Sequence, residues 1–307
     1  MPEKKPIVVV GSINMDLVAS APHIPAAGET LLGTGFETHP GGKGANQAVA
    51  AARLGVSVQM IGLLGSDDIG KQLREGLNQA GVDTSAVGIV PGVSGVALIT
   101  VADSGENSIV VASGANFQVT PEYLDKHADR IRNAGLVLVQ LEIPLASVLH
   151  LAELCAEANV PLILDPAPAH ELPESLFRQV AWLTPNETEA AFYLGHAVGD
   201  NGPEAAAHQL IAKGAKGVIL KLGGNGSYFA LASGNEASIQ PYRVQAVDST
   251  GAGDAFNGAF AAALTMGKSR LESAMFASAA SAVSVTRKGA QSSMATLEEV
   301  ERLMDGS

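Results

Sequence analysis

The segment from Val247 to Gly258 holds the residue types that most clearly suggest chemistry. Gly251 and Gly253 permit a tight turn with accessible backbone N–H groups, and Asp254 follows at once. Apolar residues then recur at helical spacing, which predicts a helix whose N-terminus binds an anion. A carboxylate beside an anion site is unfavourable unless it has a use. Accepting a proton from an attacking hydroxyl, while the anion site holds a phosphoryl group, would be such a use.

A second polar group lies near the start of the chain. Asn14 and Asp16 are two residues apart, so on a strand their side chains point to the same face. An amide and a carboxylate side by side suit neighbouring hydroxyls, such as those of a sugar. The alternative interpretation is an ordinary solvent-facing strand edge.

A glycine-rich segment, 41–48, precedes a run of small residues. Its glycines, Gly42 among them, permit close approach of the backbone to a ligand, and Lys43 and Asn46 supply donors. We expect either a ligand-binding loop or an ordinary glycine loop that opens a helix.

Three further groups follow predicted strands, where open α/β sheets bind ligands. Glu142 follows residues 136–141. Asn186 and Glu189 follow residues 182–184 and begin a helix, where they either interact with the helix dipole or hold water around Mg²⁺ and phosphates. Residues 222–226 follow another strand and either run along a nucleotide or form a hairpin turn.

The segment Gly65–Lys71 has the spacing of a phosphate-binding P-loop, but Gln72 replaces the Ser or Thr that would bind Mg²⁺. Asp67 and Asp68 would also repel phosphate, so this segment is interpreted as a helix start. No dinucleotide-binding glycine fingerprint, zinc-protease motif, serine-nucleophile elbow or Cys/His metal cluster occurs in the sequence.

Composition limits the class of protein. The 307 residues are 47% apolar with a net charge of −12, which fits one large α/β domain with a small appendage and argues against nucleic-acid or anionic-membrane partners. The single cysteine, Cys155, lies in an apolar helical pattern and is interpreted as a buried core thiol. No leader segment or membrane-length apolar run is found, and the cytoplasm is the expected compartment.

Strand-like and helix-like segments alternate along the chain, which predicts a mostly parallel sheet covered by helices on both faces. Expected strands are 7–10, 58–63, 136–141, 161–164 and 217–222; expected helices are 45–54, 67–80, 144–158 and 271–285, with others after 120, 253 and 296.

Two segments, 12–39 and 94–112, contain alternating strand patterns without intervening helices. They predict a small separate β-sheet, a candidate lid. Residues 1–11, 40–93 and 113–307 would then form the main domain, which is expected to bind nucleotide and substrate.

Taken together, the motifs resemble those of the ribokinase-type sugar kinases of the phosphofructokinase-B family, nearly from end to end. The matching segments are 11–16, 27–30 (with Ala27 in place of the usual Pro), 41–48, 140–142, 165–168, 184–189, 248–254 and 285–291. The resemblance implies a Rossmann-like three-layer αβα domain with a β-sheet lid, and commonly a homodimer formed through the lids.

It also implies transfer of the ATP γ-phosphoryl group to O5 of D-ribose, with Mg²⁺ and a monovalent cation, expected to be K⁺. By analogy Asp254 is the base, and the N–H groups of Gly251, Ala252 and Gly253 hold the phosphoryl group. The ribose contacts would be Asn14, Asp16, Gly42, Lys43, Asn46, Glu142 and Asp254. The nucleotide side would be Asn186, Glu189, Lys221, Gly223, Gly226, Gly253 and Ser278. The monovalent cation would lie near Asp248, Thr250, Ser284, Arg287, Gly289 and Ser293, largely on backbone carbonyls.

Two positions depart from the family pattern. Lys221 stands where such kinases often have Thr, and it could supply a charge near the phosphates. Ser278 lies beside the expected adenine at a variable position. Alternative functions are a deoxyribokinase, a nucleoside kinase, for which the lid segments offer few aromatic side chains (Phe36 is one), and a non-catalytic sugar-binding regulator.

Overall fold

Nine strands form the main sheet of this computed structural model, which describes residues 5–306. From one edge to the other they are β13 (Glu236–Ile239), β12 (Ser227–Leu231), β11 (Gly217–Lys221), β10 (Trp182–Leu183), β9 (Leu162–Leu164), β8 (Leu136–Val139), β1 (Ile7–Val10), β4 (Val58–Gly65) and β5 (Asp83–Val90). Neighbouring strands are parallel except at the β11–β12 and β12–β13 pairs. The predicted mostly parallel sheet is confirmed.

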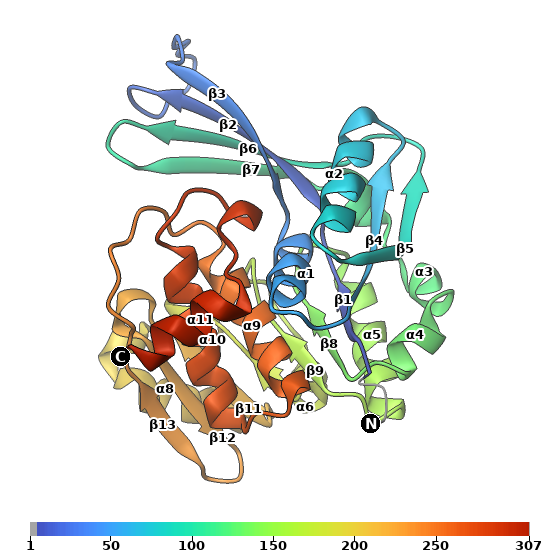
Figure 1. Cartoon of the computed structure of the whole chain (residues 1–307), viewed down its shortest axis with the longest axis vertical. Helices are drawn as coiled ribbons and strands as arrows, with labels where there is room; N and C mark the ends of the chain where they lie inside the picture. Colours follow the sequence, from blue (N-terminus) through green and yellow to red (C-terminus); the bar gives the residue numbers. More distant parts are fainter. Residues whose placement is uncertain (1–4, 307) are drawn as a thin grey trace.

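Helices cover both faces of this sheet (Figure 1). They are α1 (Lys43–Arg53), α2 (Asp68–Gln79), α3 (Pro121–Asp125), α4 (Ala128–Arg132), α5 (Leu145–Glu157), α6 (Glu174–Gln179), α7 (Glu187–Leu194), α8 (Gly202–Ala212), α9 (Ala252–Met266), α10 (Arg270–Ser284) and α11 (Leu297–Asp305).

The two faces of the sheet bury separate hydrophobic cores, because successive side chains of a strand point to opposite sides. In β1, Ile7 and Val9 pack into the core shared with α1, α2, α9, α10 and α11. Val8 and Val10 pack into the other core, with α4 to α8. All four are fully buried. This pattern explains why the strands are apolar without alternation, and it confirms the three-layer αβα architecture.

A separate four-stranded sheet has the order β3-β2-β6-β7 and projects beyond the main sheet (Figure 1). Its strands are β3 (Gly35–Gly41), β2 (Asn14–Ala21), β6 (Gly95–Ala102) and β7 (Asn107–Ala112). The β2–β6 pair is parallel and the other two pairs are antiparallel. The expected small sheet is therefore present. β3 continues two residues past position 39, to Gly41, and so leads directly into the glycine segment that opens α1.

Several local predictions are confirmed. Asp67 caps α2 by accepting a hydrogen bond from Gly70 N, as expected of a helix start rather than a P-loop. Cys155 is a buried free thiol. One strand is shorter than expected, since β8 ends at Val139 rather than at Leu141. No helix within residues 5–306 is both long and apolar enough to cross a membrane.

Candidate active site

The N-terminus of α9 begins as the sequence predicts. Gly251 has a φ of 74°, a left-handed conformation that side-chain-bearing residues rarely adopt, and it turns the chain into the helix. No hydrogen-bond acceptor for the N–H groups of Gly251 and Gly253 is found within residues 5–306. The N–H of Ala252 donates to the Ser249 carbonyl at 3.2 Å. Two of the three expected anion-binding N–H groups are thus available as the helix stands.

Asp254 lies in the first turn of α9 with only 6% of its surface exposed. Its Oδ2 atom accepts a hydrogen bond from Asn46 Nδ2 at 2.9 Å, and its Oδ1 atom accepts one from Gln47 Nε2 at 3.0 Å. Burial raises the pKa of this carboxyl, and the Asp165 carboxylate adds to the rise, against the opposing effects of Lys43 and the two amides. A raised pKa suits a group that must take up a proton.

The expected sugar-side residues converge on this carboxyl. Gly41 of β3 pairs with Asn14 of β2. A Cβ at Gly41 would lie only 2.4 Å from an Asp16 carboxylate oxygen, so the Asp16 side chain lies directly against this glycine. Burial raises the pKa of Asp16 to about 6, with further contributions from Glu142 and Asp254. Glu142 accepts a hydrogen bond from Lys43 N at 3.2 Å.

Asn14 is not a solvent-facing strand residue, because it is only 2% exposed. Its Oδ1 atom accepts a hydrogen bond from Asn116 Nδ2 at 2.6 Å. Asn116 in turn accepts from Ile13 N at 2.9 Å and donates to the Ile13 carbonyl at 3.3 Å. This contact fixes the amide of Asn14 so that its NH₂ group remains to donate to a ligand. The interpretation of Asn14 as an ordinary exposed edge residue is therefore wrong.

The glycine segment permits the approach of β2 to α1. Gly42 has a φ of 88°, and a Cβ there would lie 2.7 Å from Asn14 N. Lys43 is the first residue of α1, and Asn46 lies one turn further. The segment is thus a glycine loop that opens a helix, and its donors Lys43 N and Asn46 Nδ2 bond to Glu142 and Asp254. That it binds a ligand stays a prediction.

Asp254 also lines a cavity of about 910 Å³. The expected nucleotide residues line it, together with the base, Lys43 and the turn at α9: Lys43, Asn186, Glu189, Lys221, Gly223, Gly226, Gly251, Ala252, Gly253, Asp254 and Ser278. Its volume falls in the range of ligand sites for small molecules. The structure therefore brings every expected nucleotide residue into one space that ends at the carboxyl of Asp254.

Asn186 and Glu189 form a capping box at the start of α7. Asn186 Oδ1 accepts from Glu189 N at 2.8 Å, and Glu189 Oε2 accepts from Asn186 N at 2.8 Å. Glu189 is only 8% exposed, and burial raises its pKa with help from Asp165. A helix cap alone does not require a carboxylate this deeply buried. The same two residues that cap α7 also line the cavity.

Residues 222–226 also combine two interpretations. Gly223–Asn225 is a short 3₁₀ turn that links the antiparallel strands β11 and β12, which confirms a hairpin. The same turn lines the cavity through Gly223, Gly224 and Gly226. Gly226 has a φ of 84°, and a Cβ there would lie 2.1 Å from the Ile239 carbonyl oxygen, so the turn requires glycine.

Of the expected monovalent-cation residues, Thr250 and Gly289 contact Asp248 directly. Asp248 accepts hydrogen bonds from Thr250 N at 2.9 Å, Thr250 Oγ1 at 2.7 Å and Gly289 N at 2.8 Å. Although burial raises the pKa of Asp248, these hydrogen bonds outweigh it and lower the pKa. The Ser284 carbonyl accepts from Arg287 N at 3.4 Å, and Ser293 Oγ donates to the Ala290 carbonyl at 2.8 Å.

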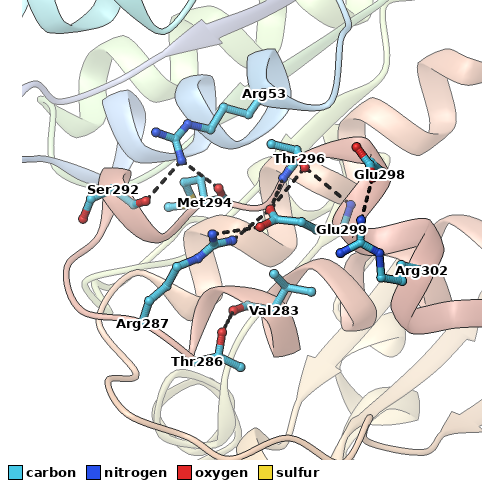
Figure 2. A network of polar contacts seen from close by, with 10 residues as sticks. All are labelled: Arg53, Val283, Thr286, Arg287, Ser292, Met294, Thr296, Glu298, Glu299 and Arg302. Atoms are coloured by element: carbon cyan, nitrogen blue, oxygen red, sulfur yellow. Dashed lines mark hydrogen bonds and ion pairs between the residues drawn. The ribbon is translucent and has the colours of Figure 1, made fainter. Parts of the chain in front are cut away.

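The Arg287 side chain points toward Glu299 of α11 (Figure 2). Its two terminal nitrogens donate to Glu299, each at 2.9 Å. On the same network, Arg53 at the end of α1 donates to the carbonyls of Ser292 and Met294, at 3.2 and 2.8 Å. These hydrogen bonds therefore attach the loop that follows α10 to α1, the helix that begins with Lys43. Arg287 can serve a cation only through its backbone, as the resemblance implies.

Sequence reasoning gave no role to Asp165 and Gln47. Asp165 is 2% exposed, and its Oδ1 atom lies 3.1 Å from Lys221 Nζ. Gln47 is fully buried and donates to Asp165 Oδ2 at 2.9 Å as well as to Asp254. Gln47 could have been noticed as a polar residue among the small apolar residues of 44–51. Asp165 could have been noticed because it directly follows a buried strand.

Comparison with known proteins agrees with this geometry. Residues 4–297 match the pfkB family carbohydrate kinases. The chain is 42% identical over 304 residues to a ribokinase of Haemophilus influenzae, covering 98% of this chain and 99% of that protein. It is 37% identical over 297 residues to a deoxyribokinase of Salmonella typhi, covering 95% and 96%.

A solved structure of Arabidopsis thaliana ribokinase complexed with ribose and ATP is also similar. The TM-score is 0.92 at 37% identity, covering 99% of this chain and 100% of that one. A family match over nearly the whole length, relatives above 30% identity and a shared fold all lead to one conclusion: the chain belongs to the pfkB family of carbohydrate kinases.

Proposed function

We propose that this protein is a ribokinase, which transfers the γ-phosphoryl group of ATP to O5 of D-ribose and yields D-ribose 5-phosphate and ADP. The position of Asp254 carries the proposal. This carboxyl lies at the N-terminus of α9, lines the 910 Å³ cavity, accepts a hydrogen bond from Asn46 and interacts electrostatically with Asp16. Full-length similarity to ribokinases supports the choice of sugar.

In this reaction Asp254 accepts the proton of the O5 hydroxyl. The O5–phosphorus bond forms as the bond between γ-phosphorus and the bridging oxygen breaks, and the electron pair of that bond leaves on ADP. Phosphoryl transfer requires positioning and charge stabilisation more than covalent chemistry from the protein. The free N–H groups of Gly251 and Gly253 stabilise the oxygens of the transferred group, and that of Ala252 contributes once it leaves the Ser249 carbonyl.

On the sugar side we assign Asn14, Asp16, Gly42, Lys43, Asn46 and Glu142 to the ribose hydroxyls. With Asp254, three carboxylates (the others are Asp16 and Glu142) and the donor side chains of Asn14, Lys43 and Asn46 match a ligand in which every hydroxyl both donates and accepts. Closure of the small sheet over the sugar would exclude water and limit wasteful hydrolysis of ATP. We infer that residues 12–39 and 94–112 form this lid, although β3 runs on to Gly41, and that residues 1–11, 40–93 and 113–307 form the main domain, of which 1–4 and 307 lie outside the described residues.

On the nucleotide side we assign Asn186, Lys221, Gly223, Gly226, Gly253 and Ser278, all of which line the cavity. For Mg²⁺, the donor set fits: Glu189 is a buried carboxylate with a raised pKa, next to Asp165, and carboxylate and water oxygens are the ligands that Mg²⁺ prefers. Bound Mg²⁺ would neutralise charge on the phosphates, and Glu189 and Asn186 would hold its water ligands.

For the monovalent cation, expected to be K⁺, the donor set also fits. Asp248, Thr250 and the carbonyl-rich loop 284–293 present oxygens beside Gly251, which begins the anion site. Such an ion would contribute positive charge near α9. Arg287, Ser284, Gly289 and Ser293 would contribute backbone oxygens, and Asp248 would hold the two loops together.

We also propose a homodimer formed through the lids and a cytoplasmic location. Leu98 of β6 and Val110 of β7 are paired, 50% and 62% exposed, and share a face with Phe36. Asp16 points to the opposite face, since it pairs with His39 and Ala97. A second copy could therefore cover the apolar face without blocking the sugar. The buried free thiol of Cys155 suits a reducing compartment.

The test is ADP release across a panel of D-ribose, 2-deoxyribose, hexoses and nucleosides, with and without K⁺. Ribose should give the highest kcat/KM. Preference for 2-deoxyribose or a nucleoside would move the assignment to a sister kinase. Binding of ribose without any ADP release would indicate a sugar-binding regulator instead.

A further inference from the structure

Lys221 places an ammonium group at the first turn of α9. It is the last residue of β11, and its Nζ atom lies 3.1 Å from Asp165 Oδ1. The two side chains are only 13% and 3% exposed. A Cβ built on Gly253 would lie 3.4 Å from the same Nζ atom. The cation therefore stands beside a backbone N–H that the turn leaves free.

The cavity otherwise carries an excess of negative charge. Four acidic residues line it, against three basic ones: Asp165, Glu187, Glu189 and Asp254, against Lys43, Lys221 and Arg243. Although burial lowers the pKa of Lys43, carboxylates led by Asp254 and Asp165 outweigh this effect and raise it, so Lys43 stays charged and interacts with several carboxylates at once. A bound triphosphate would add several negative charges to this space, and an ammonium beside α9 can offset part of them.

A chain of hydrogen bonds fixes this ammonium relative to the base. Gln47 donates from one nitrogen to Asp165 Oδ2 at 2.9 Å and to Asp254 Oδ1 at 3.0 Å. Gln140 Nε2 donates to Gln47 Oε1 at 2.7 Å, which sets the orientation of the Gln47 amide. Because all of these amides are buried, Asp165 cannot move freely, and it holds Lys221 in place.

We propose that Lys221 is a catalytic residue that binds an oxygen of the γ-phosphoryl group during transfer. Asp165 and Gln47 are positioning residues that hold this cation and the Asp254 carboxylate on either side of the transferred group. The inference rests on the proposed kinase function and deepens it. Lys221 undergoes no covalent change. Its ammonium stabilises the negative charge on the phosphoryl oxygens while the proton of O5 passes to Asp254.

The first test compares nucleotides that differ only in the γ-phosphoryl group. Lys221→Met keeps the length of the stem and removes the charge. We expect the affinity for a non-hydrolysable β,γ-imido analogue of ATP, measured by titration calorimetry, to fall on the order of tenfold, while ADP affinity changes little. Turnover should fall on the order of tenfold to a hundredfold. Lys71→Met, which breaks an exposed ion pair with Asp68, is the matched control.

An equal loss of ADP and analogue affinity, or no loss of either, would overturn the proposal. The titration needs no sugar, so it can succeed even if ribose proves to be the wrong substrate. Conversely, an inactive wild-type protein on ribose would remove the proposed function and leave the γ-phosphoryl contact to be judged by the titration.

A second test separates a direct contact from a structural counter-ion. Lys221→Met alone leaves the Asp165 carboxylate buried and unpaired, which is itself destabilising. The double variant Asp165→Asn with Lys221→Met removes both charges. If Lys221 acts on the phosphoryl group, turnover stays low in the double variant although stability recovers. A return to wild-type turnover would show that Lys221 only neutralises Asp165.

The role of Gln47 is tested through the pH profile. Gln47→Met removes the donor that favours the ionised form of Asp254, so the pKa of that carboxyl should rise further. The acid limb of the profile of kcat should therefore move to higher pH, with little change in the KM for ribose. A uniform loss of activity at every pH, with no movement of the limb, would contradict a positioning role.

Discussion

Asn46 Nδ2 lies 2.9 Å from Asp254 Oδ2, which joins two residues 208 positions apart in the sequence. One belongs to the first helix after the glycine segment and the other to the first turn of α9. The contact results from the packing of α1 against α9 on the same face of the sheet. It links the sugar-side motif to the proposed base, and with the bond from Gln47 to Oδ1 it orients the carboxylate.

Replacement of Asp254 by Asn should abolish most turnover while ribose still binds. Loss of a general base typically costs about 10² to 10⁴ in rate. The KM for ATP should change little, because Lys221 and the turn at Gly223 remain. Coupled measurement of ADP release, with ribose binding by calorimetry, checks this. Asp68→Asn, an exposed carboxylate of α2, is the control; near-normal kcat in the Asp254 variant would contradict the assignment of the base.

Gly253→Ala should separate catalysis from folding. The Gly253 φ is not positive, and a Cβ there meets only Lys221 Nζ, at 3.4 Å. We expect an unchanged Tm and a kcat reduced by about tenfold to a hundredfold, because the methyl group occupies the phosphoryl position.

Gly251→Ala is the matched comparison. Its φ of 74° is strained for alanine, and the Cβ would lie 3.1 Å from Ala290 Cβ. We expect a loss of about 1–2 kcal/mol in the free energy of unfolding, measured in urea. A similar loss of stability in both variants would show that position 253 requires glycine for the backbone turn and not for the anion site.

Binding of ribose should weaken in acid. The pKa of Asp16 is raised to about 6 by burial, Glu142 and Asp254. Below that pH the carboxyl is protonated and loses part of its capacity to accept hydrogen bonds from the sugar. The KM for ribose should therefore rise as the pH falls through about 6. In Asp16→Asn the KM should be high at every pH, without this step; a step that persists there would belong to another group.

The same carboxyl should cost stability above pH 6. Because its pKa is higher when folded than the ordinary value of 3.8, ionisation favours the unfolded chain. The penalty is absent below 3.8 and complete above about 6. At pH 7.5, Asp16→Asn should raise the free energy of unfolding by at most about 3 kcal/mol, with no gain near pH 3.5. A gain of equal size at both pH values would contradict this origin.

The Arg287–Glu299 pair should stabilise the loop that follows α10 (Figure 2). Hydrogen bonds from Arg287 lower the pKa of Glu299 to about 2. A lowered pKa means that the contribution is present above the ordinary value of 4.5 and is lost as the pH falls toward 2. Since both side chains are about one-third exposed, we expect Glu299→Gln to cost roughly 1 kcal/mol, less at high salt.

Glu298→Gln is the control for this variant, because its pair with Arg302 is fully on the surface and should contribute little. We also expect Glu299→Gln to raise the K⁺ concentration needed for half-maximal activity, because the loop 284–293 becomes less fixed. Equal effects of the two substitutions on both stability and K⁺ activation would show that the pair has no particular role.

Local features were predictable where a residue's own chemistry decides them. Thr120 and Thr296 cap helices as expected, with Pro121 at the first helical position. The alternation of apolar strands with helices indicated the parallel sheet. Strand ends were less predictable: β8 stops at Val139, because Gln140 leaves the sheet to bond with Gln47 of α1. That contact depends on residues 93 positions away.

From the sequence alone one could predict the candidate parts of the site: a turn with Gly251 and Gly253, a carboxylate at 254, and a polar pair at 14 and 16. Helix caps, turns and strand faces follow from neighbours in the chain, and the sequence contains those neighbours. The folded structure was needed to see that Asn116 orients Asn14, and that Asp165 and Gln47 connect Lys221 to Asp254. These contacts depend on which helix packs on which face of the sheet, because burial forces each polar group to find its partner there.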